Sequence, residues 1–379
     1  MVSSRSSVFF AIACLFLLFT SANLAHAASL GQWNPTASYP LKISGDSCVA
    51  MSEEIYCMGG YDTNDKSYSN VYYAPLTSSG IGSWSTGASY PTAVDSSSCV
   101  GADARVYCVG GENGQTVLNN VYSSPVSSPG LGPWSGAAAY PLPIAATSCV
   151  ASSGYIYCVG GFDNNGNEVD STYYASLSNL NSWTSTTPYP TAVDSESCVA
   201  YSAYVYCVSG ETENGGNPNN PINEVYYAQL SSSGIGAWSA ASAYPVPLAA
   251  LSCVQSSGDI YCVGGFDINL KSNGTAYSGQ ISSPGVSSWT IATPYPVAID
   301  TSSCVTDTQY IYCVAGTSDL SKGSGSTLSS SYYAALQGSG TTTSSTTPEF
   351  PNAAMLPVIL SVVLGVVSVL SIWTRKKTL

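Results

Sequence analysis

Short runs in which apolar and polar residues alternate recur along the chain and end at turn-forming residues. The run Ser98 to Ala102 is followed by Asp103-Ala104 and a second run, Arg105 to Val109, which Gly110-Gly111 ends. A period of two predicts strands, and two runs joined by two residues predict an antiparallel hairpin. No sustained helical periodicity occurs between the two terminal apolar segments, so the central part of the chain is expected to be all-β.

This hairpin pattern occurs six times at a spacing near 50 residues. Each copy has two cysteines that frame eight residues and a tyrosine directly before the second cysteine. The pairs are Cys48 with Cys57, Cys99 with Cys108, Cys149 with Cys158, Cys198 with Cys207, Cys253 with Cys262, and Cys304 with Cys313. A period of this length indicates an array of supersecondary units, none of which can bury its own faces alone.

One repeat predicts four short strands. After the hairpin, an Asn- and Gly-rich loop from Glu112 to Asn119 leads to a third strand that begins at Val121. Trp134 opens a fourth strand that ends at Tyr140-Pro141. Four antiparallel strands per repeat are typical of a propeller blade. The six blades begin near Ser47, Ser98, Ser148, Ser197, Ser252 and Ser303.

The N-terminal end of the array supplies a segment that the last repeat lacks. A tryptophan follows the third strand in the first five repeats, at Trp84, Trp134, Trp183, Trp238 and Trp289. The sixth repeat has none, but Trp33 and Tyr39-Pro40 stand alone before the first repeat. We therefore expect residues 31–40 to complete blade six beside Tyr332 to Leu336. Such closure removes exposed sheet edges.

The cysteine pairs are predicted to form disulfides within each hairpin. With a two-residue turn at Ser52-Glu53, Met51 faces Glu54, and counting outward places Cys48 opposite Cys57 at a non-hydrogen-bonded site. That close approach suits a disulfide. Zinc ligation is the alternative, but zinc sites need shorter spacing or four converging ligands. Twelve paired cysteines indicate an oxidising, extracellular location.

An N-terminal segment indicates export. Residues 1–27 combine Arg5, the apolar run Val8 to Thr20 and the small-x-small site Ala25-His26-Ala27, which is typical of a cleaved signal peptide. An uncleaved anchor is one alternative. A lipoprotein signal at Cys14 is another, although Ala11-Ile12-Ala13 matches a lipobox poorly.

The C-terminal segment indicates membrane attachment. Residues 339–352 are rich in Gly, Ser and Thr and predict a flexible stalk. Residues 353–373 are uncharged and long enough for a helix to span a bilayer. The basic tail, residues 374–379, predicts a cytoplasmic C-terminus.

Composition excludes several kinds of chemistry. Residues 28–347 carry 21 acidic and five basic residues, a net charge of −16, so nucleic acid is not an expected partner. The acidity is also compatible with a role in solubility alone. His26, the only histidine, lies in the signal, which removes histidine bases and histidine metal ligands from the mature chain. We expect no catalytic residues, and paired carboxylates for glycoside hydrolysis are the remaining enzyme alternative.

The repeat resembles the kelch motif. The order strand, Gly-Gly, Tyr about ten residues later, then Trp is similar to that pattern over residues 31–338. Ser209-Gly210 and Ala315-Gly316 depart from it, and paired cysteines are not part of the usual motif. The resemblance implies a six-bladed kelch-type β-propeller over residues 28–338. Kelch copper oxidases use histidine ligands, so that activity is not implied here.

A second resemblance concerns the C-terminal end. Pro348-Glu349-Phe350-Pro351, followed by an apolar span and a basic tail, resembles the PEF-CTERM sorting signal read by archaeosortase-type enzymes. The resemblance implies that the span is removed and replaced by a lipid anchor. A permanent single-pass type I anchor is the alternative.

Candidate ligands for a cation lie in the connections into the first strands. Four residues before the first cysteine, alternate blades carry Asp95, Asp194 and Asp300. Because first strands line the channel of a propeller, we expect these carboxylates to form a ring near one mouth. Ca²⁺ prefers such oxygen ligands and is the one cofactor that the sequence suggests. Three separate, solvated aspartates are the alternative.

Other candidate features lie in the loops and on the third strands. Asp62, Asp163 and Asp267 recur just after the glycines and are expected to form turns. Asn273-Gly274-Thr275 is an N-glycosylation sequon. The Tyr-Tyr pairs on third strands, such as Tyr173-Tyr174, fit either packing between blades or stacking on sugars.

The whole pattern favours a binding module on the extracellular face of the membrane. We expect a non-enzymatic propeller that recognises a cell-surface or extracellular protein or glycan through its variable loops. A structural role in the cell envelope is the alternative.

Overall fold

The computed structural model describes residues 29–337, apart from residues 115, 128, 214–219, 283 and 319–325. Within the described residues all regular structure is β. No helix in this part of the chain is long and apolar enough to cross a membrane. The predicted signal peptide (1–27), stalk (339–352), membrane helix (353–373) and basic tail (374–379) lie outside the described residues.

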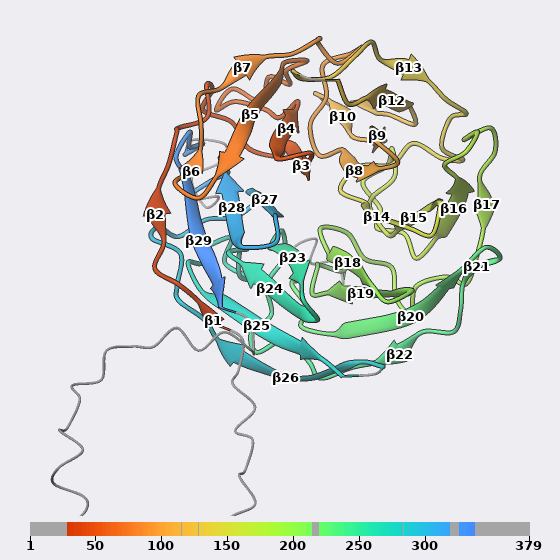
Figure 1. Ribbon diagram of the computed structural model, residues 1–379. Coiled ribbons are helices and arrows are strands. Elements are labelled where there is room, and N and C mark those ends of the chain that lie inside the picture. The colour runs from red at the N-terminus through yellow and green to blue at the C-terminus, as the bar shows by residue number, and fades with distance from the viewer. Residues whose placement is uncertain are drawn as a thin grey trace, which may run out of the picture. The chain divides into compact units, whose positions relative to one another are not determined.

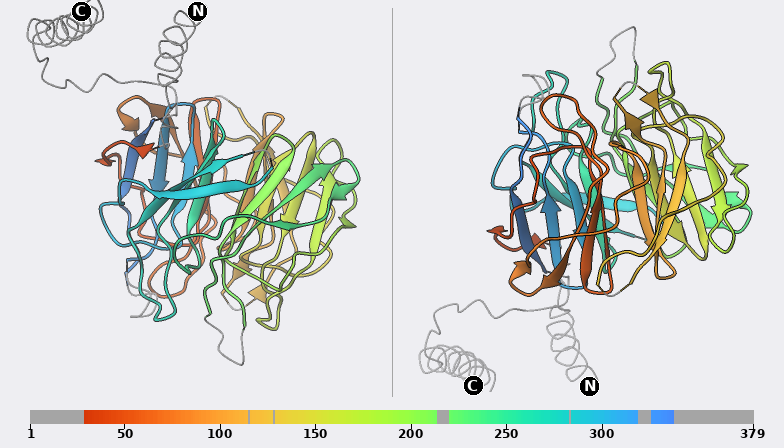
Figure 2. Two further views of the ribbon diagram at one scale, coloured as in Figure 1. Left: turned by 90° about the horizontal axis from the view of Figure 1, so that it is seen from below. Right: turned by 90° about the horizontal axis from the view of Figure 1, so that it is seen from above.

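Six antiparallel sheets form a ring around a central axis (Figure 1). In each sheet the first strand of the repeat is innermost and pairs with the second, which pairs with the third. First strands of neighbouring blades contact one another around the axis. In side view the strands run between two faces of the ring (Figure 2). The prediction of an all-β, six-bladed propeller is therefore confirmed.

Blades one to three each begin with a hairpin of two five-residue strands. Blade one comprises β3 (Ser47–Met51), β4 (Glu54–Met58), β5 (Val71–Thr77), β6 (Gly80–Ile81) and β7 (Ser85–Thr86). Blade two comprises β8 (Ser98–Ala102), β9 (Arg105–Val109), β12 (Val121–Pro125) and β13 (Ser135–Gly136), with β10 (Glu112–Asn113) and β11 (Thr116–Val117) as a small separate sheet. Blade three comprises β14 (Ser148–Ser152), β15 (Tyr155–Val159), β16 (Thr172–Ser176) and β17 (Thr184–Ser185).

Blades four to six repeat this arrangement. Blade four comprises β18 (Ser197–Tyr201), β19 (Tyr204–Val208), β20 (Val225–Ser231), β21 (Gly234–Ile235) and β22 (Ser239–Ala240). Blade five comprises β23 (Ser252–Ser256), β24 (Asp259–Val263), β25 (Ala276–Ile281) and β26 (Val286–Ile291). Blade six comprises β27 (Ser303–Thr306), β28 (Tyr310–Val314) and β29 (Ser331–Gln337), with β1 (Ser29–Leu30) and β2 (Asn34–Pro35).

The hairpin register follows the sequence-based argument. Met51 pairs with Glu54, and Cys48 pairs with Cys57. In blade one the turn residues Ser52 and Glu53 have φ of 52° and 64°, as in the tight turns whose twist matches that of paired strands. The turn and the alternation together therefore place the two cysteines opposite each other.

The structure joins all six cysteine pairs as disulfides within their hairpins. Each pair has a Cα–Cα distance of 4.0 Å. The bonds are Cys48 to Cys57, Cys99 to Cys108, Cys149 to Cys158, Cys198 to Cys207, Cys253 to Cys262, and Cys304 to Cys313. In every blade the disulfide thus ties the innermost strand to its neighbour, in the pairing that the sequence predicted.

The N-terminal strands complete blade six, as predicted. In Figure 1 the red β1 and β2 lie beside the blue β29. β1 pairs with the end of β29 at Leu336 and Gln337, and β2 pairs with Tyr333 and Tyr332. The paired residues begin at Ser29 and end at Pro35, slightly earlier than the predicted 31–40. Thr36 still donates its N–H to Ser331 O (3.0 Å), after which the chain leaves the sheet.

Trp33 occupies the same place in blade six as the other tryptophans occupy in their blades. Its ring meets Tyr295 edge to face at 4.9 Å, and Nε1 donates to Thr293 O (3.0 Å). In blade one, Trp84 likewise meets Tyr39 at 5.0 Å and donates to Ala37 O (3.2 Å). Such edge-to-face pairs add to the energy of area burial. The seam that contains Trp33, which we call the sixth seam, is thus built like the seam that contains Trp84, which we call the first seam.

A closed set of hydrogen bonds links the innermost strands. The serine before each first cysteine accepts the backbone N–H of the cysteine in the following blade. Ser47 Oγ accepts from Cys99 (3.0 Å), and Ser303 Oγ accepts from Cys48 (2.8 Å), which closes the circle. The same bond occurs at Cys149, Cys198, Cys253 and Cys304. The repeated Ser-Cys pair is therefore explained by contact between blades.

The fourth strands differ from the prediction. In blade two the strand is only Ser135–Gly136, whereas the sequence predicted one that begins at Trp134 and ends at Tyr140-Pro141. In blade five Trp289 lies inside the longer β26. The outermost strand has one neighbour only, and in blade two the chain leaves it to bury Tyr140, which is 1% exposed. Burial of the aromatic ring therefore competes with edge pairing.

Candidate binding site on the loop face

One face of the ring carries the connections into the first strands and the loops between second and third strands. We call it the loop face. On it, the residue that follows each glycine pair bridges to the connection of the same blade. These bridges are Ser44–Tyr61, Asp95–Glu112, Ala145–Phe162, Asp194–Glu211, Ala249–Phe266 and Asp300–Thr317. The backbone of each predicted aspartate therefore pairs with the loop of its own blade, and in two cases the paired residue is a glutamate.

The glycine pair makes this close bridge possible. A Cβ on Gly111 would lie 2.6 Å from Asp95 O, and Gly111 has φ of 94°. Real side chains avoid both that distance and that conformation. Ser209 and Ala315, which depart from the Gly-Gly pattern, still adopt φ of 58° and 54°. All six blades can therefore bring the loop against the connection.

Asp95 lies at the junction of blades one and two with its oxygens occupied. It is 4% exposed, Oδ2 accepts from Ser67 Oγ (2.6 Å) and Oδ1 accepts from Ser96 Oγ (3.0 Å). Burial raises the pKa of Asp95 despite these hydrogen bonds. Burial, and then the charge of Asp95, raises the pKa of Glu112 to about 7. The hydroxyl of Ser67, from the loop of the preceding blade, compensates part of the cost of burying this carboxylate.

Asp300 repeats this arrangement at the junction of blades five and six. Ser272, from the preceding blade, donates its hydroxyl to Asp300 Oδ2, and Thr301 donates to Oδ1 (3.1 Å). Thr317 stands opposite where blade two has Glu112. Asp300 is thus a buried, hydrogen-bonded carboxylate that has one acidic neighbour fewer than Asp95.

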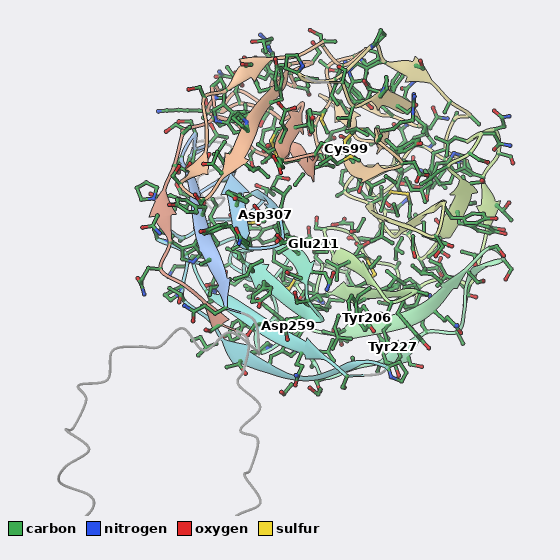
Figure 3. All side chains as sticks on the ribbon, in the orientation of Figure 1. Cys99, Tyr206, Glu211, Tyr227, Asp259 and Asp307 are labelled. Atoms are coloured by element: carbon green, nitrogen blue, oxygen red, sulfur yellow. A yellow bond between two sulfur atoms is a disulfide. The ribbon has the colours of Figure 1, made fainter. Side chains whose placement is uncertain are left out.

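The junction of blades three and four is different. Phe162 bridges to Glu168 just as Tyr61 bridges to Ser67, so a glutamate stands where a serine serves Asp95. The charge of Glu168 acts on both Asp194 and Glu211. Three acidic side chains therefore meet at this junction, and we call Glu168, Asp194 and Glu211 the acidic cluster. Figure 3 marks Glu211 close to the centre of the ring.

The acidic cluster is partly buried and incompletely hydrogen-bonded. Asp194 is 6% exposed, and its Oδ1, like Glu211 Oε2, has no hydrogen-bond partner among the described residues. Burial, with the charge of Glu168, raises the pKa of Asp194 to about 6. Burial, and then the charges of Asp194 and Glu168, raises the pKa of Glu211 to about 8. Buried acceptors without donors are costly, so this site favours a positively charged or hydrogen-bond-donating group.

A further buried carboxyl group lies beside the cluster. Glu196 is 6% exposed, and neither of its carboxyl oxygens has a hydrogen-bond partner among the described residues. Burial raises the pKa of Glu196 well above its ordinary range, and the charge of Asp194 adds to the rise. Glu196 belongs to the ring of residues around a space of about 200 Å³ at the channel mouth. Carboxyl groups are thus concentrated where blades three and four meet.

The structure does not gather the three predicted aspartates into one coordination shell. Among the described residues, the group of three potential ligand atoms within 4.8 Å of one another is Asp46, Cys48 and Cys57, and both cysteines are held in a disulfide. Asp95, Asp194 and Asp300 form no such group. Binding of Ca²⁺ by these aspartates stays a prediction.

The other candidate residues have mainly local contacts. Asp62, Asp163 and Asp267 each accept backbone N–H groups two and four residues later, so they form turns as expected. Tyr174 stacks on Tyr157 at 6.0 Å within its blade, which favours the packing interpretation of the Tyr-Tyr pairs. Asn273 is partly buried, and its Oδ1 accepts from Thr275 N–H (2.7 Å). Its glycosylation stays a prediction.

The repeat pattern did not indicate Glu168 and Glu211 as site residues. Glu211 directly follows Ser209-Gly210, so its place after the glycine position was visible in the repeat. Glu168 stands in a loop of variable length, where repeats do not align position by position. Its approach to Asp194 depends on two different blades, and no spacing within one repeat shows it.

A comparison with protein families agrees with this architecture. Residues 23–210 match the family model described as the KLHDC2/KLHL20/DRC7 Kelch-repeats domain. No curated protein matches the chain. Kelch propellers commonly act as protein-interaction modules. The family match and the six-bladed ring together support a kelch-type β-propeller over the described residues.

Proposed function

We propose that this protein is an exported, membrane-anchored, non-enzymatic binding module whose loop face binds a positively charged segment of an extracellular protein. The acidic cluster carries the proposal. It places three carboxyl groups at one junction and leaves buried oxygens on Asp194 and Glu211 without donors. A lysine or arginine side chain supplies both the missing charge and the missing N–H groups.

The charge of the module supports a cationic partner. Residues 28–347 carry a net charge of −16, which attracts basic partners over distance and repels acidic ones. The closed ring holds the loop-face residues on a rigid scaffold, which reduces the ordering cost of binding. Neither effect depends on a catalytic group.

The anchor belongs to the proposal on the sequence alone. The signal peptide predicted for residues 1–27 and the stalk and apolar span predicted for residues 339–373 support export and attachment to a membrane, as a retained span or through a lipid.

Titration calorimetry on the whole chain in detergent tests the proposal. The probes are the peptide acetyl-(Gly-Lys)₄-amide, the same peptide with glutamine in place of lysine, and Ca²⁺. We expect preferential binding of the lysine peptide, with an affinity that rises as the pH passes about 8 because Glu211 then loses its proton.

Glu168→Ser should weaken binding of the lysine peptide at least about tenfold, a loss of about 1.4 kcal/mol. Asp170→Asn is the matched control, because it removes one charge from an exposed residue of the same loop. Equal binding of both peptides, or equal effects of the two variants, would contradict the proposal. Binding of Ca²⁺ that Asp194→Ala abolishes would instead favour the cation site predicted from the sequence.

A further inference from the structure

The face opposite the loop face carries a cavity that the proposed function does not use. We call this face the hairpin face, because the turns between first and second strands lie on it. The cavity has a volume of about 740 Å³ and lies among turns of blades one, five and six. Its lining comprises residues 50–53, 76–78, 255–257 and 306–310. Cavities that bind small molecules span roughly 300–1,000 Å³, so this one is large enough for a ligand.

The residue that ends the first strand differs in size between blades four and five. Tyr201 ends the first strand of blade four, opposite Tyr204, and its hydroxyl reaches the turn of blade five at Gly258. At the same register in blade five stands Ser256, opposite Asp259. A serine cannot reach the next blade, so the corresponding space toward blade six is open.

The turn of blade six also differs from its counterparts. The turns of the other blades use two residues with positive φ, whereas Thr308 and Gln309 have none. Asp307 shapes this turn: Oδ1 accepts the N–H groups of Gln309 (2.6 Å) and Tyr310 (2.7 Å), and Oδ2 accepts from Tyr312 Oη (2.8 Å). The charge of Asp307 is thus used within the protein, and the turn presents Thr308 and Gln309 to solvent. Figure 3 marks Asp307 on the inner side of blade six.

The groups left to meet a ligand are mostly neutral and polar. They include the hydroxyls of serine and threonine residues and the amides of Gln255 and Gln309. With Gln255 Oε1 turned toward the N–H groups of Ser257 (3.2 Å) and Gly258 (3.0 Å), Nε2 is left as a donor. The lining contains no lysine or arginine, and its carboxylates are Glu53 and Asp307. An anionic ligand would find no counter-charge here.

An aromatic ring forms part of the wall. Tyr310 lines the cavity, and it is braced by Tyr333 at 5.6 Å and Tyr312 at 6.1 Å. A rigid, half-buried ring offers a flat apolar surface beside the hydroxyl and amide groups. Sugars combine an apolar C–H face with hydroxyls that both donate and accept, which is the complement of such a wall.

We propose that the hairpin cavity is a second ligand site and that it binds a neutral carbohydrate. The sugar would stack on Tyr310 and exchange hydrogen bonds with Gln255, Gln309 and Thr308. The site is independent of the acidic cluster, because it lies on the other face and uses other blades.

A binding panel on the whole chain in detergent tests this proposal. The probes are maltotriose, cellotriose, mannotriose and chitotriose, with sialyllactose as the anionic comparator and a Ser-Gly-Gln-Gly peptide as the neutral non-sugar comparator. We expect ligand-observed NMR and calorimetry to detect at least one neutral trisaccharide, and neither comparator. Binding of no neutral sugar, or equal binding of a comparator, would overturn the proposal.

Ser256→Tyr is the decisive variant, because it fills the cavity with the side chain that blade four already holds at that register. It should weaken binding of the trisaccharide at least tenfold. Ser152→Tyr, at the same register in blade three and outside the cavity, is the matched control and should leave binding unchanged. Thr308→Ala with Gln309→Ala, both exposed, provides a second test that does not depend on accommodation of a tyrosine.

The Glu168→Ser variant separates the two proposals. It should weaken binding of the lysine peptide and leave binding of the trisaccharide unchanged. Unchanged sugar binding in both Ser256→Tyr and the double variant of Thr308 and Gln309 would place the sugar elsewhere and overturn the assignment of the cavity.

Discussion

The seams between blades and the junctions on the loop face differ in how far they repeat. Each seam contains an edge-to-face pair of a tryptophan and a buried tyrosine, with centroid distances of 4.8 to 5.0 Å in all six. The junctions change from blade to blade: Asp95 and Asp300 receive a serine hydroxyl, whereas Asp194 meets Glu168. The seams, which repeat, hold the ring together, whereas the junction of blades three and four differs from the others and contains a partly buried acidic cluster. A group whose burial costs free energy that no neighbouring group offsets is typical of a functional site.

The strongest test of the seams is to remove the closing segment. Deletion of residues 29–36 takes away β1, β2 and Trp33, exposes the edge of β29 and opens the sixth seam. We expect the melting temperature, measured by calorimetry on the whole chain, to fall by more than about 10 °C, since several kcal/mol are lost at once. An unchanged melting temperature would show that closure of the ring does not contribute to stability.

Substitution of single tryptophans tests whether the sixth seam contributes as much stability as the first. Trp33→Ala and Trp84→Ala each remove a large ring from between blades and should cost about 3–5 kcal/mol of unfolding free energy. Denaturant titration measures both. If Trp33→Ala costs much less than Trp84→Ala, the seam in which the N-terminal segment packs against Tyr295 is looser than the seam at Trp84, and the equivalence seen in the structure does not hold energetically.

The acidic junction should make stability depend on pH. The pKa values of Asp194 and Glu211 are raised in the folded state, so their ionisation favours unfolding. Their contribution is fully present below the ordinary carboxyl pKa near 4 and is lost as the pH rises to about 8. Glu168→Ser removes one repelling charge and supplies a donor for Asp194, as Ser67 does for Asp95. The variant should gain on the order of 1 kcal/mol at pH 8 and little at pH 4.5.

The reciprocal change is the control for that comparison. Ser67→Glu builds an acidic cluster around Asp95 and Glu112, and it should lose stability at pH 8 relative to pH 4.5. Both variants are measured by chemical denaturation at the two pH values. Parallel pH profiles for wild type and both variants would contradict the account of the junctions.

The smallest expected effect concerns the hydrogen bonds around the channel. Ser252→Ala removes the acceptor of Cys304 N–H (3.0 Å) and should cost about 1 kcal/mol. Ser47→Ala, which affects Cys99, should cost a similar amount because the bonds repeat around the ring. Amide hydrogen exchange at Cys304 and Cys99 checks both, and unchanged protection would mean that these bonds do not hold the inner strands.

Most of the ring could be predicted from the sequence, because its determinants are local or recur. Alternation and a two-residue turn set the register of Cys48 against Cys57, and that register brought the two cysteines close enough for a disulfide. The lone Trp33 before the first repeat showed that the N-terminal segment completes blade six. The fourth strands could not be predicted as well, since burial of Tyr140 competes there with pairing at an edge.

The tertiary structure alone decided which groups meet across blades. Asp194 was visible in the sequence, but Glu168 reaches it only because the ring brings the loop of blade three against the connection into blade four. The aspartates predicted to form one ring lie at separate junctions, where the carboxylates of Asp95 and Asp300 accept serine hydroxyls of the preceding blade and Asp194 meets Glu168. The hairpin cavity likewise lies among turns of blades one, five and six, which come together only once the blades are placed around the ring. The repeated sequence determines the fold of one blade and the number of blades, whereas the contacts between blades depend on the radius of the closed ring.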